Sequence, residues 1–241
     1  MKIVISQPMF FPWVGMFEQI RLADTYVHYS DVQFSKGSFV NRVQIKTDTG
    51  IKWLTVPLEK LRLGQSIDEV RINDQSNWRD KHLTALRLAY VNAPCFQDMM
   101  DLVESVYVNQ YETIDQLSEA SLNAVCRYFH LEEGRSFISA KTLEIVGSSS
   151  RRVLDIVLAL GGDRYITGLG ALRYLDHQLF EDNGVSVEYM NYRKAPYAQL
   201  HGAFTPFVSV LDLIANEGTD GLKYINSGTT YWKELLNHGS E

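Results

Sequence analysis

Residues 1–31 read MKIVISQPMFFPWVGMFEQIRLADTYVHYSD, and this stretch decides the fold class. Its first part, Lys2–Ser6, is short and rich in β-formers and stops before Pro8, as expected of a buried strand that ends in a turn. Apolar residues then recur at three- to four-residue spacing over Trp13–Ala23, which predicts a helix. Thr25–Tyr29 is rich in β-branched and aromatic residues and predicts a second strand.

The alternation of strand and helix returns after Gly134. We expect, in order, a strand over 136–145, a helix through Val153 to Leu160, a strand over 164–167, a helix over 171–182 and a strand over 185–189. Such alternation favours parallel strands joined by crossover helices. The sequence therefore predicts an α/β fold with an open, mostly parallel, Rossmann-like sheet.

Two further segments lie between these parts of the chain. Alternating residues on both sides of Thr47–Gly50 predict an N-terminal β-hairpin, and Ile67–Ile72 suggests one more strand. Helical spacing over residues 78–133 predicts a helical middle segment inserted into the sheet domain. At 241 residues the chain is expected to fold as a single α/β domain over 1–241.

Composition excludes several classes of function. The formal net charge is −6, so no general attraction to nucleic acid or anionic lipid is expected. Cys95 and Cys126 are the only cysteines, and neither a disulfide framework nor metal-ligand spacing is present in the sequence. The N-terminus lacks the long apolar core of a signal peptide, and no run of about 18 apolar residues occurs. We expect a cytoplasmic protein without a membrane segment, a metal or a cofactor.

Candidate site residues follow the first two strands, because ligands of doubly wound sheets bind beyond the carboxyl ends of the strands. The turn QPMFFPWVG at residues 7–15 is crowded with aromatic side chains. It is either a platform for a ring-bearing ligand beside helix amides that suit an anion, or an aromatic plug in the core. Asp31 follows the second strand at the same edge as Gln7. It suits binding of a sugar hydroxyl or amine, or general base catalysis, although a turn or capping role is open as well.

Cations gather in the next segment, Lys36–Lys46. Arg42 and Lys46 are an even number of residues apart, so on a strand they face the same side. That arrangement suits phosphate or carboxylate recognition, or is a solvated hairpin face. His201 lies in the irregular stretch KAPYAQLHGAFTPF and is a candidate acid or base. No dinucleotide, phosphate-loop, zinc-protease or serine-hydrolase motif is found.

Taken together, four blocks of sequence resemble the WbqC-like family, which is associated with bacterial surface-polysaccharide gene sets. The blocks are QPMFFPWVGMFEQIRLAD, YSDVQFSKGSFVNRVQIK, YITGLGALRYLD and YAQLHGAFTPFVSVLDLIANEG. The resemblance implies an acyl or aminoacyl transferase, with glycine among the groups transferred. Its substrate would be a nucleotide-linked amino sugar of O-antigen (lipopolysaccharide) biosynthesis, and its partner an activated acyl donor of unknown identity.

Residue by residue, the resemblance marks positions in both halves of the chain. They are Gln7, Pro12, Trp13, Gly15, Asp31, Gln33, Lys36, Asn41, Arg42, Lys46, Gly168, Asp176, Tyr197, Gln199, His201, Phe204, Pro206 and Asp212. Phe10 and Met16 stand where the family commonly has tyrosine, so a hydroxyl at either position is not essential in this chain.

These observations give a leading hypothesis with assigned roles. Asp31 or His201 assists deprotonation of the acceptor amine, Arg42 and Lys46 hold phosphates, and Trp13 stacks on a base or sugar. The remaining substrate-binding candidates are Gln7, Gln33, Lys36, Asn41, Tyr197 and Gln199. The hypothesis requires Asp31, Arg42 and His201 to line one cleft above the first strand.

Two alternative functions stay open. One is a non-catalytic accessory protein that binds a nucleotide sugar or a carrier in the same pocket. A looser likeness to nucleotidyltransferase-type folds, which use ATP, is weakened because residues 12–15 read PWVG and lack the HxGH histidines of that class. Apolar helix faces would serve a homodimer as well as a core.

Overall fold

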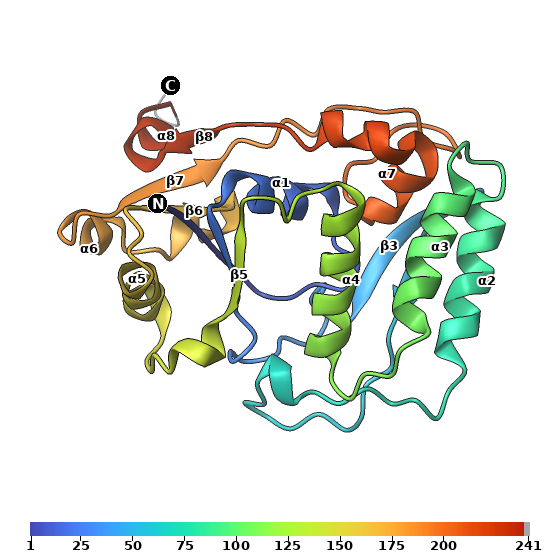
Figure 1. Ribbon diagram of the computed structural model, residues 1–241, viewed down its shortest axis with the longest axis horizontal. Helices are drawn as coiled ribbons and strands as arrows, with labels where there is room; N and C mark the ends of the chain where they lie inside the picture. Colours follow the sequence, from blue (N-terminus) through green and yellow to red (C-terminus); the bar gives the residue numbers. More distant parts are fainter. Residues whose placement is uncertain (239–241) are drawn as a thin grey trace.

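The chain forms a six-stranded sheet in the computed structural model, which describes residues 1–238; the sheet occupies the left half of the view in Figure 1. The strands lie in the order β5 (Ser136–Ser139), β2 (Thr25–His28), β1 (Lys2–Ser6), β6 (Arg164–Thr167), β7 (Ser186–Met190) and β8 (Thr229–Tyr231). The first five are mutually parallel, and β8 pairs antiparallel with β7. The open, mostly parallel α/β sheet predicted from the sequence is confirmed.

The direction of strand order reverses beside β1. From β1 the chain passes to β2 and later to β5 on one side, and then returns to β6 on the other side. The carboxyl ends of β1 and β6 therefore flank a topological switch point, where sheets of this kind form a crevice.

Alternate residues of β1 enter two separate cores. Val4 packs into the core that contains α1 (Val14–Leu22), whereas Ile3 and Ile5 pack into the core that contains α5 (Ser149–Ala159). All three side chains are at most 7% exposed. Because helices cover both faces of the sheet, the centre of β1, Ile3–Ile5, is continuously apolar instead of alternating with polar residues.

The second core also contains α6 (His177–Glu181) and receives Trp232 from α8 (Trp232–His238).

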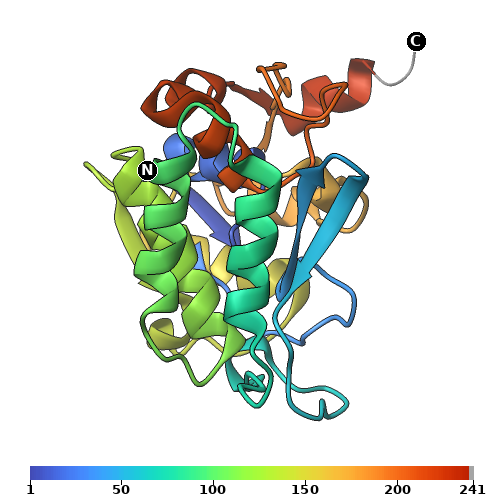
Figure 2. The ribbon, with the colours of Figure 1, turned by 90° about the vertical axis from the view of Figure 1, so that its right-hand side faces the viewer.

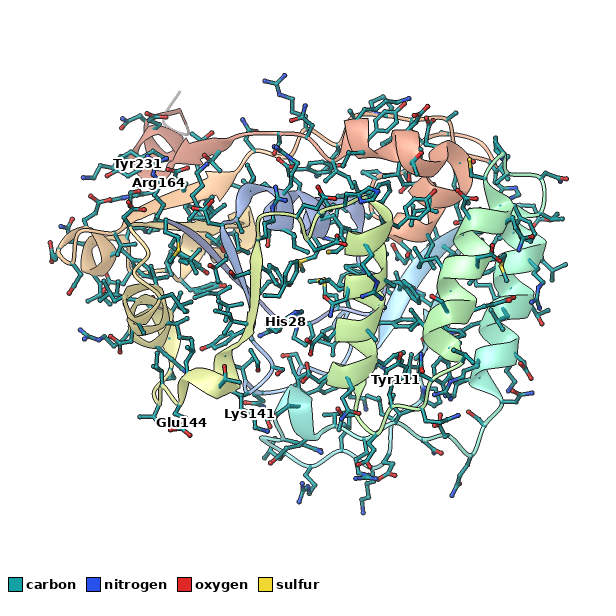
Figure 3. The ribbon with its side chains drawn as sticks, in the orientation of Figure 1. His28, Tyr111, Lys141, Glu144, Arg164 and Tyr231 are labelled. Carbon is teal, nitrogen blue, oxygen red and sulfur yellow. The ribbon has the colours of Figure 1, made fainter. Side chains whose placement is uncertain are left out.

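On the opposite side of the sheet, His28 at the end of β2 lies between β5 and α4 (Ile114–Tyr128) (Figure 3). The His28 side chain is 2% exposed and stacks edge-on against Tyr26. Polar groups are thus buried at the carboxyl end of β2.

The middle of the chain forms the predicted hairpin and helices. Strands β3 (Arg42–Thr47) and β4 (Gly50–Thr55) pair antiparallel and lie beside α2 (Trp78–Tyr90) (Figure 2). Helix α3 (Phe96–Tyr107) packs on α2, on α4 and on α7 (Val210–Glu217). The sequence predictions of an N-terminal hairpin and a helical middle segment are confirmed.

Three expected elements differ in the structure. Residues 67–72 were expected as a strand, but Ile67–Glu69 form a 3-10 turn, η1, because Ile67 and Val70 are both buried at a spacing of three. The strand expected over 136–145 ends at Ser139 and continues as η2 (Ala140–Leu143). The helix expected over 171–182 is divided into η3 (Leu169–Arg173) and α6, since Asp176 caps a new helix by accepting from Leu179 N.

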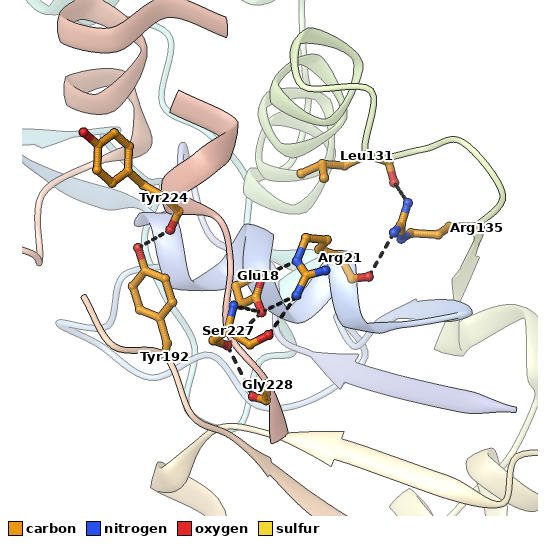
Figure 4. Close-up of polar contacts among 8 residues, drawn as sticks. All are labelled: Glu18, Arg21, Leu131, Arg135, Tyr192, Tyr224, Ser227 and Gly228. Atoms are coloured by element: carbon orange, nitrogen blue, oxygen red, sulfur yellow. Dashed lines mark hydrogen bonds and ion pairs between the residues drawn. The ribbon is translucent and has the colours of Figure 1, made fainter. Parts of the chain in front are cut away.

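A buried carboxylate fastens α1 to the segment before β8 (Figure 4). Glu18 is 0% exposed and accepts from Arg21 Nε at 2.6 Å and from both the backbone N and the Oγ of Ser227 at 2.7 Å. Arg21 also donates to Ser227 O. Because this buried charge is paired and fully hydrogen-bonded, it holds η4 (Gly218–Tyr224) and the following strand onto the sheet.

No helix within residues 1–238 is long and apolar enough to cross a membrane.

Candidate functional site

A cavity of about 800 Å³ opens at the switch point of the sheet. It lies above the carboxyl ends of β1 and β6 and beneath the start of α5, and its volume is within the range of small-molecule sites. We call it the switch-point cavity. Its polar lining comprises Ser6, Gln7, Gln19, Tyr29, Asp31, Gln33, Ser148, Ser149, Ser150, Arg152, Tyr165, Thr167 and Tyr174.

One charged pair lies in the wall of the switch-point cavity. Arg152 Nη2 donates to Oδ2 of Asp31, and Arg152 Nε donates to Ile145 O at 2.9 Å. The guanidinium carbon lies 5.0 Å from the ring centre of Tyr29. Burial, the largest single effect, disfavours the charged form of Arg152, but the hydrogen bonds and charges of Asp31 and Tyr29 together outweigh it and raise the Arg152 pKa above its ordinary value. The pair is therefore a fixed ionic contact.

The second oxygen of Asp31 is left without a partner. Among residues 1–238, Oδ1 of Asp31 is a buried atom with no hydrogen bond. A buried acceptor without a donor lowers the free energy of unfolding by about 1 to 3 kcal/mol. Because Asp31 lines the cavity, a donor group of a bound ligand is able to satisfy it.

The turn that begins α5 forms another part of the wall. Gly147 and Ser149 have positive φ values of 120° and 54°, and Ser148 is the N-cap residue, without a side-chain capping bond. The first amides of an α-helix have no partner within the helix, and its dipole favours an anion at this end. Ser150 has a fixed role in this turn, because its Oγ accepts from Asp176 N at 2.9 Å.

Small residues keep the opposite wall open. A Cβ atom on Gly168 would lie 3.1 Å from Nε2 of Gln19, so glycine allows the close approach of this amide to the end of β6. At Gly170 a Cβ atom would meet nothing within 4 Å. Tyr174, which is 74% exposed, lies at the mouth. The cavity therefore combines amide, hydroxyl, carboxylate and aromatic groups.

Of the residues predicted from the sequence, Gln7, Asp31 and Gln33 line the switch-point cavity. Arg42 and His201 are not among its lining residues, so Asp31, Arg42 and His201 do not share it. The Arg42 guanidinium stacks on Trp53 at 4.3 Å and donates to Gly37 O. Nε2 of His201 lies 2.7 Å from Ala89 O.

Three more predicted residues meet in a buried network away from the cavity. Lys46 Nζ donates to Oε1 of Gln199, and Gln199 Nε2 donates to the hydroxyl of Tyr197. Tyr197 in turn donates to Oδ1 of Asp212 at 2.8 Å, and Tyr90 donates to Oδ2 of the same carboxylate at 2.9 Å. Burial raises the pKa of Asp212, which the hydrogen bonds from the two tyrosines oppose. We call these five residues the Lys46 network.

The remaining predicted residues lie elsewhere. Asn41 Nδ2 donates to Val56 O across the hairpin base, and Lys36 is exposed on the loop before β3. Trp13 is half-buried, with its ring against Tyr192 and Phe207, and it does not line the switch-point cavity.

The aromatic turn before α1 is largely a core plug. Phe10 and Phe11 are 0% exposed and pack against Tyr107. The backbone of Phe11, at a φ of 39°, is held by Ser121 Oγ, which accepts from Phe11 N, and by Ser209 Oγ, which donates to Phe11 O. Of the two interpretations of this turn, the structure favours packing for Phe10 and Phe11.

Sequence reasoning missed the α5 side of the cavity. The signal was present as Gly147-Ser148-Ser149-Ser150, a run of small polar residues between a strand and a helix. It was hidden because the expected strand was extended to residue 145. Arg152 carried no separate signal, since its partner Asp31 is 121 residues away.

Comparison with known proteins places this geometry in a family. The sequence model of the WbqC-like protein family matches residues 7–224, which include the switch-point cavity from Gln7 onward and the Lys46 network. The chain belongs to the WbqC-like protein family. An uncharacterized protein of Mycobacterium tuberculosis, Rv1507c, is 31% identical to this WbqC-like chain over 227 residues, which cover 93% of the chain and 97% of the relative. No solved structure matches this WbqC-like chain significantly.

Proposed function

We propose that this WbqC-like chain binds a nucleotide-linked amino sugar in the switch-point cavity and transfers an acyl or aminoacyl group, such as glycyl, to the sugar amine. The proposal assigns the chain to bacterial surface-polysaccharide (O-antigen) biosynthesis, in keeping with the association of its family. The observation that carries it is the position of the cavity, at the strand ends where doubly wound sheets hold nucleotides.

The parts of the cavity suit the parts of such a ligand. The start of α5 and the hydroxyls of Ser148 and Ser149 suit the phosphates, because free helix amides and the helix dipole both attract anions. Tyr174 at the mouth offers a ring face for the base. Gln7 and Gln19 supply amide groups for the sugar hydroxyls.

Asp31 supplies the acid-base chemistry in this proposal. Once the bound amine has given up the proton that makes it an ammonium, its nitrogen attacks the carbonyl carbon of the donor and the new C–N bond forms. The bond from that carbon to the leaving group then breaks with its electron pair, and the leaving group takes up the second proton from nitrogen. The first proton lost by the amine passes to Oδ1 of Asp31, the oxygen that has no other partner within residues 1–238. A positioned base of this kind contributes roughly 10²- to 10⁴-fold in rate.

Two glycine substitutions form a matched test. Gly170→Leu places a side chain inside the switch-point cavity, whereas Gly228→Leu places the same side chain at a position that is equally open but outside the cavity lining. Neither glycine has a positive φ, so backbone strain is not expected in either variant.

Binding is measured by thermal shift with UDP, dTDP, GDP and CMP sugars, and transfer by mass spectrometry with acyl coenzyme A and aminoacyl-tRNA donors. We expect Gly170→Leu to lose both binding and transfer, and Gly228→Leu to keep both activities. Binding by Gly170→Leu at the wild-type level would place the ligand outside this cavity. Binding by the wild-type protein without product from any donor would favour the accessory role.

A further inference from the structure

The two carboxylate oxygens of Asp31 have different surroundings. Oδ2 accepts from Arg152, whereas Oδ1 is buried beside the switch-point cavity without a partner among residues 1–238. The Asp31 side chain is 23% exposed. One oxygen is thus fixed by Arg152, and the other is a buried acceptor without a donor in a residue that lines the cavity.

Arg152 is itself held from three directions. Its Nε donates to Ile145 O, its Nη2 reaches Asp31, and its guanidinium lies over the ring of Tyr29. These contacts come from the loop before α5 and from the segment that follows β2, and they leave the Arg152 side chain 8% exposed. A planar, rigid fork fixed in this way sets the direction in which the Asp31 carboxylate points.

We propose that Arg152 is a positioning residue that aims Oδ1 of Asp31 at the amine of the ligand, and that this pair makes the switch-point cavity select amino sugars over the matching hydroxy sugars. The inference rests on the proposed function. It assigns Arg152 a specificity role that is separate from the transfer chemistry.

The physical basis is the different strength of two hydrogen bonds. A protonated amine donates to a carboxylate with both groups charged, so Coulomb attraction between opposite charges is added to the charge-assisted hydrogen bond. A hydroxyl at the same position donates to the same oxygen but carries no charge of its own, so it lacks this added attraction. We expect the amino sugar to bind about 10-fold more tightly, which corresponds to about 1.4 kcal/mol.

The test measures this preference by titration calorimetry on the full chain. Two matched pairs of ligands differ only in amine against hydroxyl: UDP-glucosamine with UDP-glucose, and dTDP-4-amino-4,6-dideoxyglucose with dTDP-6-deoxyglucose. The ratio of affinities within a pair cancels the contribution of the nucleotide. We expect a preference of about 10-fold for the amino sugar in at least one pair.

Four variants separate positioning from structural effects. Arg152→Gln and Asp31→Asn should bring the ratio of amino-sugar to hydroxy-sugar affinity close to one, while binding of the hydroxy sugar persists. Arg152→Lys should restore part of the preference for the amino sugar. Arg151→Gln is the matched control, because Arg151 pairs with Asp155 on the exposed side of α5. It should keep the full ratio.

Three outcomes overturn the inference. One is an equal affinity for amino and hydroxy sugars in both pairs, which leaves the cavity proposal standing. Another is an unchanged ratio in Arg152→Gln and Asp31→Asn. The third is no binding of any of the four ligands, in which case the thermal-shift comparison of Gly170→Leu with Gly228→Leu shows whether the proposed function also fails.

Discussion

The Lys46 ammonium nitrogen lies 3.1 Å from Oε1 of Gln199. It also lies 3.1 Å from Gly202 O and 2.6 Å from Ala203 O. An ammonium group has three N–H donors, and all three are directed at oxygens of one loop. Lys46, which is 4% exposed, therefore anchors this loop to β3 and has no donor left for a phosphate.

Lys46→Met should destabilise the fold and leave ligand binding intact. The substitution keeps the length of the side chain but leaves three oxygens without their charged donor, at a cost of about 2 to 4 kcal/mol. Urea unfolding measures this loss, and thermal shift with nucleotide sugars measures binding. Loss of nucleotide affinity in a variant that still folds would instead support the phosphate-binding role predicted from the sequence.

Gly15→Ala should destabilise the protein through Trp13. A Cβ atom at position 15 would lie 2.2 Å from Cη2 of Trp13, whose ring is packed against Tyr192 and Phe207. Displacing this ring should cost about 1 to 3 kcal/mol in unfolding free energy.

Gly15→Ala should change from destabilising to stabilising when Trp13 is removed. In a Trp13→Ala background, Gly15→Ala no longer meets the ring, and alanine within α1 should stabilise by up to about 1 kcal/mol. Denaturant unfolding of the four proteins in this cycle provides the measurement. An equal effect of Gly15→Ala in both backgrounds would show that the contact with Trp13 is not the cause.

The sheet was predictable because its signals are local. Lys2–Ser6 is continuously apolar at its centre since both faces of β1 are covered, and the hairpin alternates about a turn at Thr47–Gly50. In contrast, the strand expected over 67–72 was wrong. Ile67 and Val70 are both buried, and their spacing of three residues suits a 3-10 turn better than a strand.

The part of the candidate site that follows β1 and β2 could be found from the sequence. Gln7 and Asp31 follow neighbouring parallel strands, so their proximity at one sheet edge follows from topology. Arg152 could not be paired with Asp31, because that contact depends on the return of the chain from β5 to α5. The coverage of Lys46 by the loop from Gln199 likewise depends on tertiary structure alone.

His201→Ala should leave transfer activity unchanged and lower stability by about 1 kcal/mol. The His201 ring is hydrogen-bonded to Ala89 O, outside the switch-point cavity, and its backbone has a φ of 65°. His201→Asn is the control for the backbone, since asparagine tolerates this conformation. Loss of turnover in both variants, with folding and ligand affinity unchanged, would restore His201 as the catalytic base.

The stability of the fold in acid should depend on the buried His28 and the half-buried Asp115, whose pKa values are shifted in opposite directions. Burial lowers the pKa of His28 to about 4, and burial raises the pKa of Asp115 to about 6. An unfolded histidine titrates near pH 6.5, so between about pH 6.5 and 4 the unfolded chain binds more protons at His28 than the folded protein does. His28 therefore stabilises the fold above pH 6.5, and this contribution is lost as the pH falls toward 4.

Asp115 has the opposite effect, because the folded protein binds its proton more tightly than the unfolded chain does. Its contribution to stability is present at pH 4 and is lost as the pH rises through 6.

His28→Gln should therefore reduce the difference in unfolding free energy between pH 7 and pH 4 by up to about 3 kcal/mol, and Asp115→Asn should increase this difference. Urea unfolding at half-unit pH steps measures both slopes, with His130→Gln, at an exposed position, as the control. Parallel pH profiles for wild type and His28→Gln would show that His28 is not held neutral in the folded protein.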